Sequence, residues 1–137
     1  MSSKGSGEAG IRSLIQRLPV AIVRLDLDGK VIATSDRLVQ MLGYSQEEVP
    51  TIEVWWPLAY PDPEYRQEVM AKWETAVRDS LQNGTDIQPM EYRITCKGGE
   101  VRAFEVSGVT LTDGLIAVFD DVTERQHAES IQRRLMR

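Results

Sequence analysis

The chain has 137 residues, 16 of them basic and 21 acidic, which gives a formal net charge of −5 at pH 7. This length predicts one domain with a single hydrophobic core. Charges of both signs are interspersed, which argues against nucleic-acid binding, and the lack of a long apolar run argues against direct membrane insertion.

Residue types that carry out catalysis or bind metals are scarce. The chain has one cysteine, Cys96, and one histidine, His127. A single cysteine excludes an internal disulfide and is consistent with a reducing, cytoplasmic location. We expect no catalytic residue and no metal site, because nucleophilic triads and transition-metal centres need more of these side chains.

The N-terminal region predicts a leader and a short helix. Residues 1–10 read as a flexible leader or a tag. Apolar residues then recur at helical spacing over 11–19, until Pro19 interrupts the pattern. These residues, which we expect to contact a second copy in a homodimer, are Ile11, Leu14, Ile15 and Leu18.

A β-hairpin follows this helix. Residues 20–27 and 30–34 have strand character and flank Asp28-Gly29. That dipeptide is typical of a type I′ turn, in which both central residues take positive φ.

The middle of the chain predicts helices. Ser35 caps a helix that Gly43 ends, and Ser45 to Glu48 form a capping box for one short turn. The longest helix opens at Asp62-Pro63 and ends at Asn83-Gly84. Its predicted apolar stripe consists of Tyr65, Val69, Trp73, Val77 and Leu81.

Three strands and a helix complete the pattern. Residues 87–96, 101–111 and 115–119 predict a meander, in which Pro89 indicates a sheet edge or a bulge. Asp121 and Glu124 form a capping box for a helix over 122–137. Two strands, then helices, then three strands predict an α+β fold with one antiparallel sheet and its helices on one face, plus flanking terminal helices. Pairing the last strand with the first makes both central.

The order of several short segments resembles the PAS sensory domain family. The matching segments are Leu18-Pro19-Val20-Ala21-Ile22, Leu42-Gly43-Tyr44-Ser45 with Glu48, Trp56-Pro57-Leu58-Ala59-Tyr60-Pro61-Asp62, Tyr92-Arg93, Gly99-Glu100-Val101-Arg102 and Asp121-Val122-Thr123-Glu124-Arg125. The last is the most similar to the family's Asp-Ile-Thr junction. The resemblance implies that residues 20–121 form a five-stranded sheet of order 2-1-5-4-3 with a pocket under its helices. It also implies an input module for a histidine kinase or a diguanylate cyclase.

Several cofactor-bearing branches of this family are disfavoured. Residues 63–83 contain no histidine that could ligate haem, and Cys96 lies outside the helical middle where a covalent flavin or thioester chromophore would attach. A non-covalent flavin or a small organic ligand remains open. The predicted pocket residues, for which plain core packing is the alternative, are Leu42, Trp55, Met70, Trp73, Val77, Tyr92 and Phe104.

The C-terminal helix predicts the output of the domain. Ala128, Ile131 and Leu135 form a thin apolar seam, which matches the start of a coiled coil leading into an effector beyond Arg137. Asp121 and Thr123 are the predicted coupling hinge. Two alternatives are a ligand-free interaction and dimerisation module, and a small α+β cone-type enzyme with Glu91 or Glu105 inside its cavity.

Overall fold

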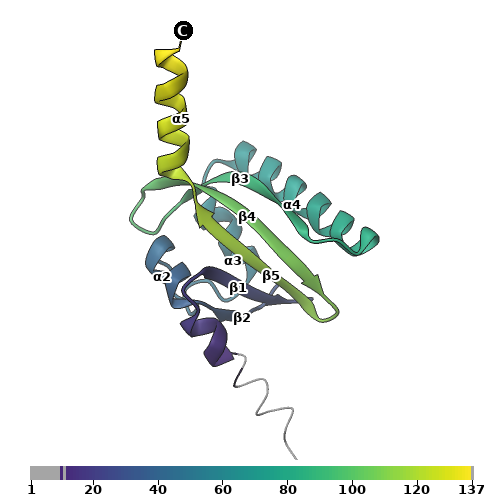
Figure 1. Ribbon diagram of the computed structural model, residues 1–137. Helices are drawn as coiled ribbons and strands as arrows, with labels where there is room; N and C mark the ends of the chain where they lie inside the picture. Colours follow the sequence, from purple (N-terminus) through teal and green to yellow (C-terminus); the bar gives the residue numbers. More distant parts are fainter. Residues whose placement is uncertain (1–9, 11, 137) are drawn as a thin grey trace, which may run out of the picture.

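A computed structural model describes residues 10 and 12–136 of the chain (Figure 1). Residues 12–17 are helical, and the predicted leader lies outside the described residues apart from Gly10, as does Ile11. The strands are β1 (Ala21–Asp26), β2 (Val31–Thr34), β3 (Ile87–Thr95), β4 (Val101–Leu111) and β5 (Gly114–Asp121). The helices are α2 (Asp36–Leu42), α3 (Ile52–Ala59), α4 (Pro63–Asn83) and α5 (Thr123–Leu135).

The strands form one antiparallel sheet of order β2-β1-β5-β4-β3, as predicted. Strands β1 and β5 are neighbours in the interior of the sheet, because the apolar run of β5 pairs with β1 from Ala21↔Phe119 to Asp26↔Gly114. Pro89 lies on the edge strand β3, where the register shifts between Ile87 and Met90. The expectation of an edge or a bulge is therefore confirmed on both counts.

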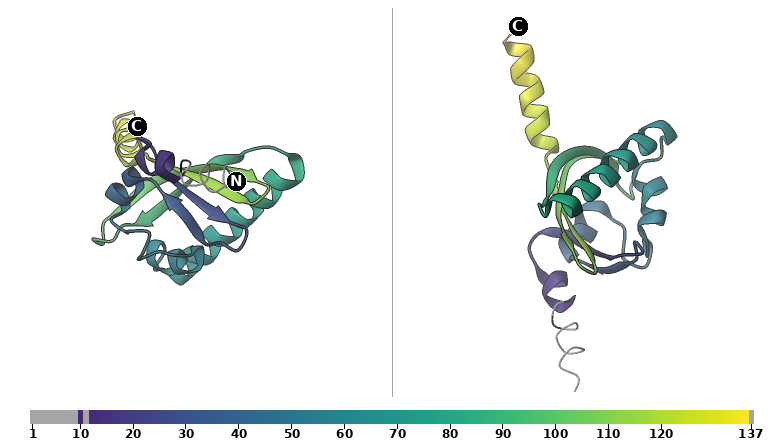
Figure 2. Two further views of the ribbon diagram at one scale, coloured as in Figure 1. Left: turned by 90° about the horizontal axis from the view of Figure 1, so that it is seen from below. Right: turned by 90° about the vertical axis from the view of Figure 1, so that its right-hand side faces the viewer.

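The two faces of the sheet carry separate apolar clusters. Helices α3 and α4 lie on one side of the sheet, while α5 projects beyond its edge (Figures 1 and 2). The main cluster contains Phe104 and Val106 of the sheet with Val69 and Trp73 of α4. A smaller cluster on the opposite, outer face is formed by Ile15 with partners from β1, β2 and β5.

The turn between β1 and β2 is not the predicted type I′ turn. None of the described non-glycine residues has a positive φ, and in this turn only Gly29 does, at 82°. The Gly29 N–H donates to the Asp26 carbonyl at 3.1 Å. The Asp26 carboxylate accepts from the N–H groups of Asp28 and Lys30, each at 2.9 Å. This carboxylate stabilises a longer turn over residues 27–29, so β1 ends at Asp26 and not at Leu27.

The predicted caps of the helical middle form. The Ser35 hydroxyl accepts from the Leu38 N–H, and Gly43 ends α2 at φ 87°. The capping box consists of the Ser45 N–H donating to Glu48 Oε1 at 3.0 Å and the Glu48 N–H donating to Ser45 Oγ at 3.2 Å. These bonds anchor the connection between α2 and α3.

Three features of the middle differ from the prediction. Helix α3 has no predicted counterpart; Pro57 lies inside it, which weakens the helical signal, and the Thr51 hydroxyl caps its start. Asp62 takes the cap position of α4 without a side-chain hydrogen bond. At the end of α4, Leu81 is 61% exposed, whereas Ser80 is buried and bonds Thr110 Oγ1 at 2.9 Å. Leu81 therefore does not belong to the buried stripe.

Candidate functional site: an interior cavity and a strand-to-helix junction

An interior cavity of about 80 Å³ lies between the sheet and the helices that cover it. It is walled by Val106, Ala117 and Phe119 from the sheet and by side chains from α2, α3 and α4. Every residue that lines it is uncharged. The cavity is thus apolar, with a few hydroxyl and amide groups at its borders.

The cavity receives four of the seven predicted pocket residues. Leu42, Trp55, Trp73 and Tyr92 line it. Phe104 is fully buried and packs against Phe119 with ring centroids 6.3 Å apart, so it lies in the core outside the cavity lining. Met70 and Val77 are half-buried on α4, away from the lining, because Val69 and Trp73 take the inward positions of that helix.

Trp55 joins the aromatic rings around the cavity. Its ring makes edge contacts with Tyr44 at 6.3 Å, Tyr60 at 6.2 Å and Phe119 at 6.1 Å. Such pairs stabilise beyond the area that they bury. Tyr44 and Tyr60 also line the cavity but were not among the predicted pocket residues. Both lie in connections that flank α3, so strand and helix periodicity gives no signal for them.

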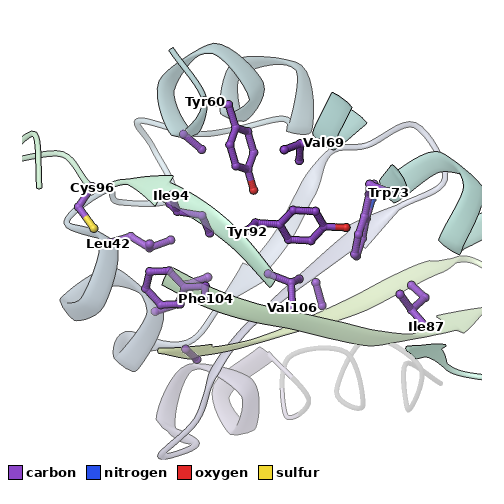
Figure 3. Packing of buried hydrophobic residues seen from close by; sticks show 14 residues of the cluster. Leu42, Tyr60, Val69, Trp73, Ile87, Tyr92, Ile94, Cys96, Phe104 and Val106 are labelled. Carbon is purple, nitrogen blue, oxygen red and sulfur yellow. The ribbon is translucent and has the colours of Figure 1, made fainter. Parts of the chain in front are cut away.

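Two buried tyrosines present hydroxyl groups to the interior (Figure 3). Tyr60 is 3% exposed and Tyr92 is also 3% exposed. Burial raises the pKa of both, with smaller contributions from neighbouring tyrosines, because the charged phenolate would be poorly solvated there. Both groups therefore stay protonated and can donate a hydrogen bond.

The second part of the site is the junction between β5 and α5. The Asp121 carboxylate accepts from Arg102 Nε on β4 at 2.5 Å and from the Thr123 N–H at 3.0 Å. The Thr123 hydroxyl donates to Asp121 Oδ1 at 2.6 Å and accepts from the Ala103 N–H at 2.9 Å. Asp121 and Thr123 thus tie the first residue of α5 to β4.

The predicted capping box at this junction is not formed. The cap position of α5 is Val122, which makes no side-chain cap bond. The Asp121 carboxylate is instead held by Arg102 and Thr123. Register explains the difference: Asp121 is the last residue of β5 and lies opposite Phe104, which brings it beside β4.

A row of three carboxylates crosses the outer face next to this junction. Glu91 pairs with Glu105, and Glu105 pairs with Asp120 on the adjacent strand. Like charges placed directly opposite one another destabilise a sheet. Arg125 of α5 forms an ion pair with Glu105 at 3.2 Å, and Gln126 donates to Glu91. The start of α5 is therefore held by the outer face as well.

The positions of Glu91 and Glu105 in this row test the alternative of a cone-type enzyme. Neither Glu91 nor Glu105 lines the cavity, because both lie on the outer face of the sheet. The cone-type enzyme needed one of them inside. The positions of these two residues therefore do not support that alternative.

The predicted dimer residues lie in different surroundings. Ile15 is buried against Ile22 and Ala33 of its own chain, so its side chain is not available to a partner. Leu14 is 61% exposed, and Leu18 is half-buried beside the same cluster. Ile11 lies outside the described residues.

Helix α5 has no buried residue, and its apolar seam faces solvent. Ile131 is 42% exposed and Leu135 is 80% exposed, and Ala128 is exposed as well. Figure 1 places α5 and residues 12–17 at opposite ends of the domain. The two predicted dimer segments therefore do not form one continuous surface on a single copy.

The Asp121 network predicts a dependence of stability on pH. Partial burial alone would raise the pKa of Asp121, but hydrogen bonds from Thr123 and Arg102 outweigh it and lower that pKa. The network therefore stabilises the fold above the unfolded-state value of about 3.9, and this stabilisation is lost as the pH falls through the folded-state pKa. Urea unfolding at a series of pH values should show a steeper loss below about pH 4 in the wild type than in Asp121→Asn. Parallel profiles would contradict this assignment.

Two further findings concern metals and membranes. Within residues 10 and 12–136, no three side chains of the metal-binding types gather closely enough to hold an ion. None of the helices in this part of the chain combines the length and the apolar character needed to cross a bilayer.

Comparison with solved structures gives matches to LOV and PAS domains. The chain is similar to a LOV protein from Rhodobacter sphaeroides, with 15% identity, a TM-score of 0.66 and coverage of 88% of this chain and 69% of that chain. It is similar to the ethanol-bound PAS domain of a LuxR-family transcriptional regulator from Burkholderia thailandensis, with 16% identity, a TM-score of 0.61 and coverage of 80% and 95%. A PAS domain from a two-component sensor histidine kinase matches with 12% identity, a TM-score of 0.60 and coverage of 87% and 99%.

Comparison of the sequence identifies the family. No curated protein matches. The model of the family described as PAS fold matches residues 15–127, which is most of the chain. The strand order, the helices over one face and the cavity beneath them agree with that match. The chain therefore belongs to the PAS family of sensory domains.

Proposed function

We propose that this chain is the input module of a larger cytoplasmic signalling protein, in which the state of the cavity sets the geometry of α5. The observation that carries the proposal is the continuity of β5. Ala117 and Phe119 of this strand wall the cavity, and two residues later Asp121 enters the network that holds α5. A change in the cavity thus has a short, hydrogen-bonded route to the helix.

The attached effector is proposed to be a histidine kinase or a diguanylate cyclase, with the module itself non-catalytic. The PAS domain from a two-component sensor histidine kinase among the structural matches supports the first choice. The exposed seam of α5 supports a homodimer in which two copies of this helix pair. In such an arrangement, a small rotation of α5 changes how the two effectors face each other.

A flavin does not fit the cavity as it stands. Its volume of about 80 Å³ is well below the roughly 300–1,000 Å³ typical of sites for cofactors and drug-sized ligands. We therefore propose a small organic ligand and not the flavin that the LOV match would suggest. The ethanol-bound neighbour supports a ligand of this size.

A ligand of this kind must prefer one output state. A tenfold preference shifts the equilibrium between the two states by about 1.4 kcal/mol, and equal affinity shifts nothing. The rival function is a dimerisation module with a filled core and no ligand. The small cavity volume favours this rival, whereas the route from the cavity to α5 favours a sensor.

Filling the cavity from β5 tests the proposal. Ala117→Val adds two methyl groups to the cavity wall and is expected to change the output of a fused histidine kinase several-fold, as a bound ligand would. The autophosphorylation rates of the wild-type fusion and of the Ala117→Val fusion measure the change.

The matched control is Ala33→Val. Ala33 is also a buried strand alanine, but it belongs to the cluster on the outer face of the sheet. The same added volume there is expected to leave the output near the wild-type level. Equal effects of the two substitutions would mean that general overpacking drives the output, which would contradict the sensor function.

A further inference from the structure

We propose that the cavity takes a small uncharged organic molecule with one hydrogen-bond-accepting oxygen, which the Tyr60 hydroxyl holds. The sensor function proposed above is the premise, since the occupant would be the signal. Three properties of the cavity define this ligand class: the charge of its lining, the free donor that it offers, and its volume.

The lining excludes ions. None of the residues that surround the cavity is an acid, a base or a histidine. Burying a carboxylate or an ammonium group without a partner of opposite charge is strongly unfavourable. A neutral molecule meets no such penalty, so the occupant is uncharged.

Several polar groups of the lining are already engaged. Tyr44 donates to the Thr95 carbonyl at 3.4 Å, and the Gln46 amide donates to carbonyls of β2, at 3.3 Å for Val31 and 3.4 Å for Ile32. The Tyr92 hydroxyl lies 3.7 Å from the Met90 sulfur, a weak acceptor. These groups shape the cavity more than they select its occupant.

Tyr60 is the donor aimed into the interior. Figure 3 shows its hydroxyl directed toward the Tyr92 side chain, with Val69 beside the ring. No group in the described part of the chain accepts a hydrogen bond from it. Every side-chain oxygen or nitrogen there that is fully enclosed does have a hydrogen-bond partner, so the Tyr60 hydroxyl is not fully enclosed. The hydroxyl therefore borders open space. Burial raises its pKa, so it remains a donor at any physiological pH. An oxygen acceptor on the ligand would complete its hydrogen bonding.

The volume sets the size. An apolar protein cavity of about 150 Å³ holds benzene, so a cavity of about 80 Å³ holds a smaller molecule, of about three to five non-hydrogen atoms. Short alcohols and ketones match this size and carry the required oxygen. Acetone and acetate are nearly isosteric probes that differ in charge.

The experiment is an NMR titration of the full chain with acetone and with acetate, following the amide signals of Val106, Ala117 and Phe119. Acetone is expected to shift these signals with a millimolar dissociation constant, as its few atoms allow, and acetate is expected to bind at least about tenfold more weakly. Equal affinity for the two probes would overturn the ligand class. This comparison needs no variant.

Two tyrosine variants test the donor. Tyr60→Phe is expected to weaken acetone binding about fivefold, the typical effect of one lost hydrogen bond, while leaving xenon binding unchanged. Tyr44→Phe is the matched control, because its hydroxyl is already bonded to Thr95, and acetone affinity should stay at the wild-type level. Unchanged acetone affinity in Tyr60→Phe would overturn the role of Tyr60.

Failure here and failure of the proposed function give different results. The titrations involve no effector, so acetone can bind as expected even when Ala117→Val leaves the fused kinase unaffected, which would contradict only the sensor function. Conversely, a cavity that binds neither acetone nor xenon would overturn the ligand class, whatever the fusion shows.

Discussion

Replacing Asp121 with alanine is expected to disconnect the cavity from the output while leaving the domain folded. The carboxylate accepts hydrogen bonds from Arg102 and from both the N–H and the hydroxyl of Thr123. Without it, the first turn of α5 loses its link to Arg102 and the bonds that orient Thr123, while the Thr123–Ala103 bond and the Arg125–Glu105 ion pair still join it to β4. An allosteric coupling of about 1–3 kcal/mol corresponds to a change of about 5- to 150-fold. In the Asp121→Ala background, the ratio of kinase output with Ala117→Val to kinase output without it should fall toward one.

The measurement compares a fused histidine kinase carrying Ala117→Val with and without Asp121→Ala. Asp120→Ala is the matched control, since Asp120 is the exposed neighbouring aspartate on the opposite face of β5. The control should keep the full response to Ala117→Val. A full response in Asp121→Ala as well would show that the signal takes another route.

Replacing Phe104 with alanine is expected to lower the free energy of unfolding by about 3–5 kcal/mol. The side chain is fully buried at the centre of the main cluster, between β3 and β5, and packs against Phe119. Its removal leaves a void that neighbouring strands cannot fill without breaking their pairing. Urea denaturation measures the loss.

Val101→Ala provides the comparison for this effect. Val101 lies on the same strand, but its side chain is 56% exposed. Its truncation should change the free energy of unfolding by less than about 0.5 kcal/mol. A loss below about 1 kcal/mol in Phe104→Ala would mean that the main cluster is not packed as described.

Much of the fold could be predicted from local patterns in the sequence. Alternation in β3 and the apolar run of β5 identified strands, and the caps at Ser35, Gly43 and Ser45 depend only on neighbouring residues. Pro89 likewise indicated the edge strand, because proline has no backbone N–H to donate to a neighbouring strand. The strand order came from the resemblance to a known family, because no local pattern encodes which strands pair.

Two of the differences have local causes, and a third depends on residues that are distant in the sequence. Asp26 changed the first turn through its own carboxylate, and Pro57 obscured α3. Ile15 has the spacing of a dimer contact, yet strands of its own chain cover it. Sequence spacing identifies an apolar side chain but not the surface that buries it.

The candidate site was only partly predictable for the same reason. Asp121 and Thr123 were expected at the junction, but the partner of Asp121 is Arg102, which only the register of β4 and β5 brings near. Phe104 and Tyr60 are both buried aromatics, and only their direction makes one a core residue and the other a cavity wall.

The most direct test of the relay is the position of α5 itself. Spin labels at the exposed positions Gln82 and Gln132, in a Cys96→Ser background, would report the distance between the end of α4 and α5 by pulsed electron paramagnetic resonance. Filling the cavity with Ala117→Val should shift this distance distribution, and adding Asp121→Ala should abolish the shift. A distance distribution that stays unchanged in Ala117→Val, or a shift that persists without the Asp121 carboxylate, would contradict the account.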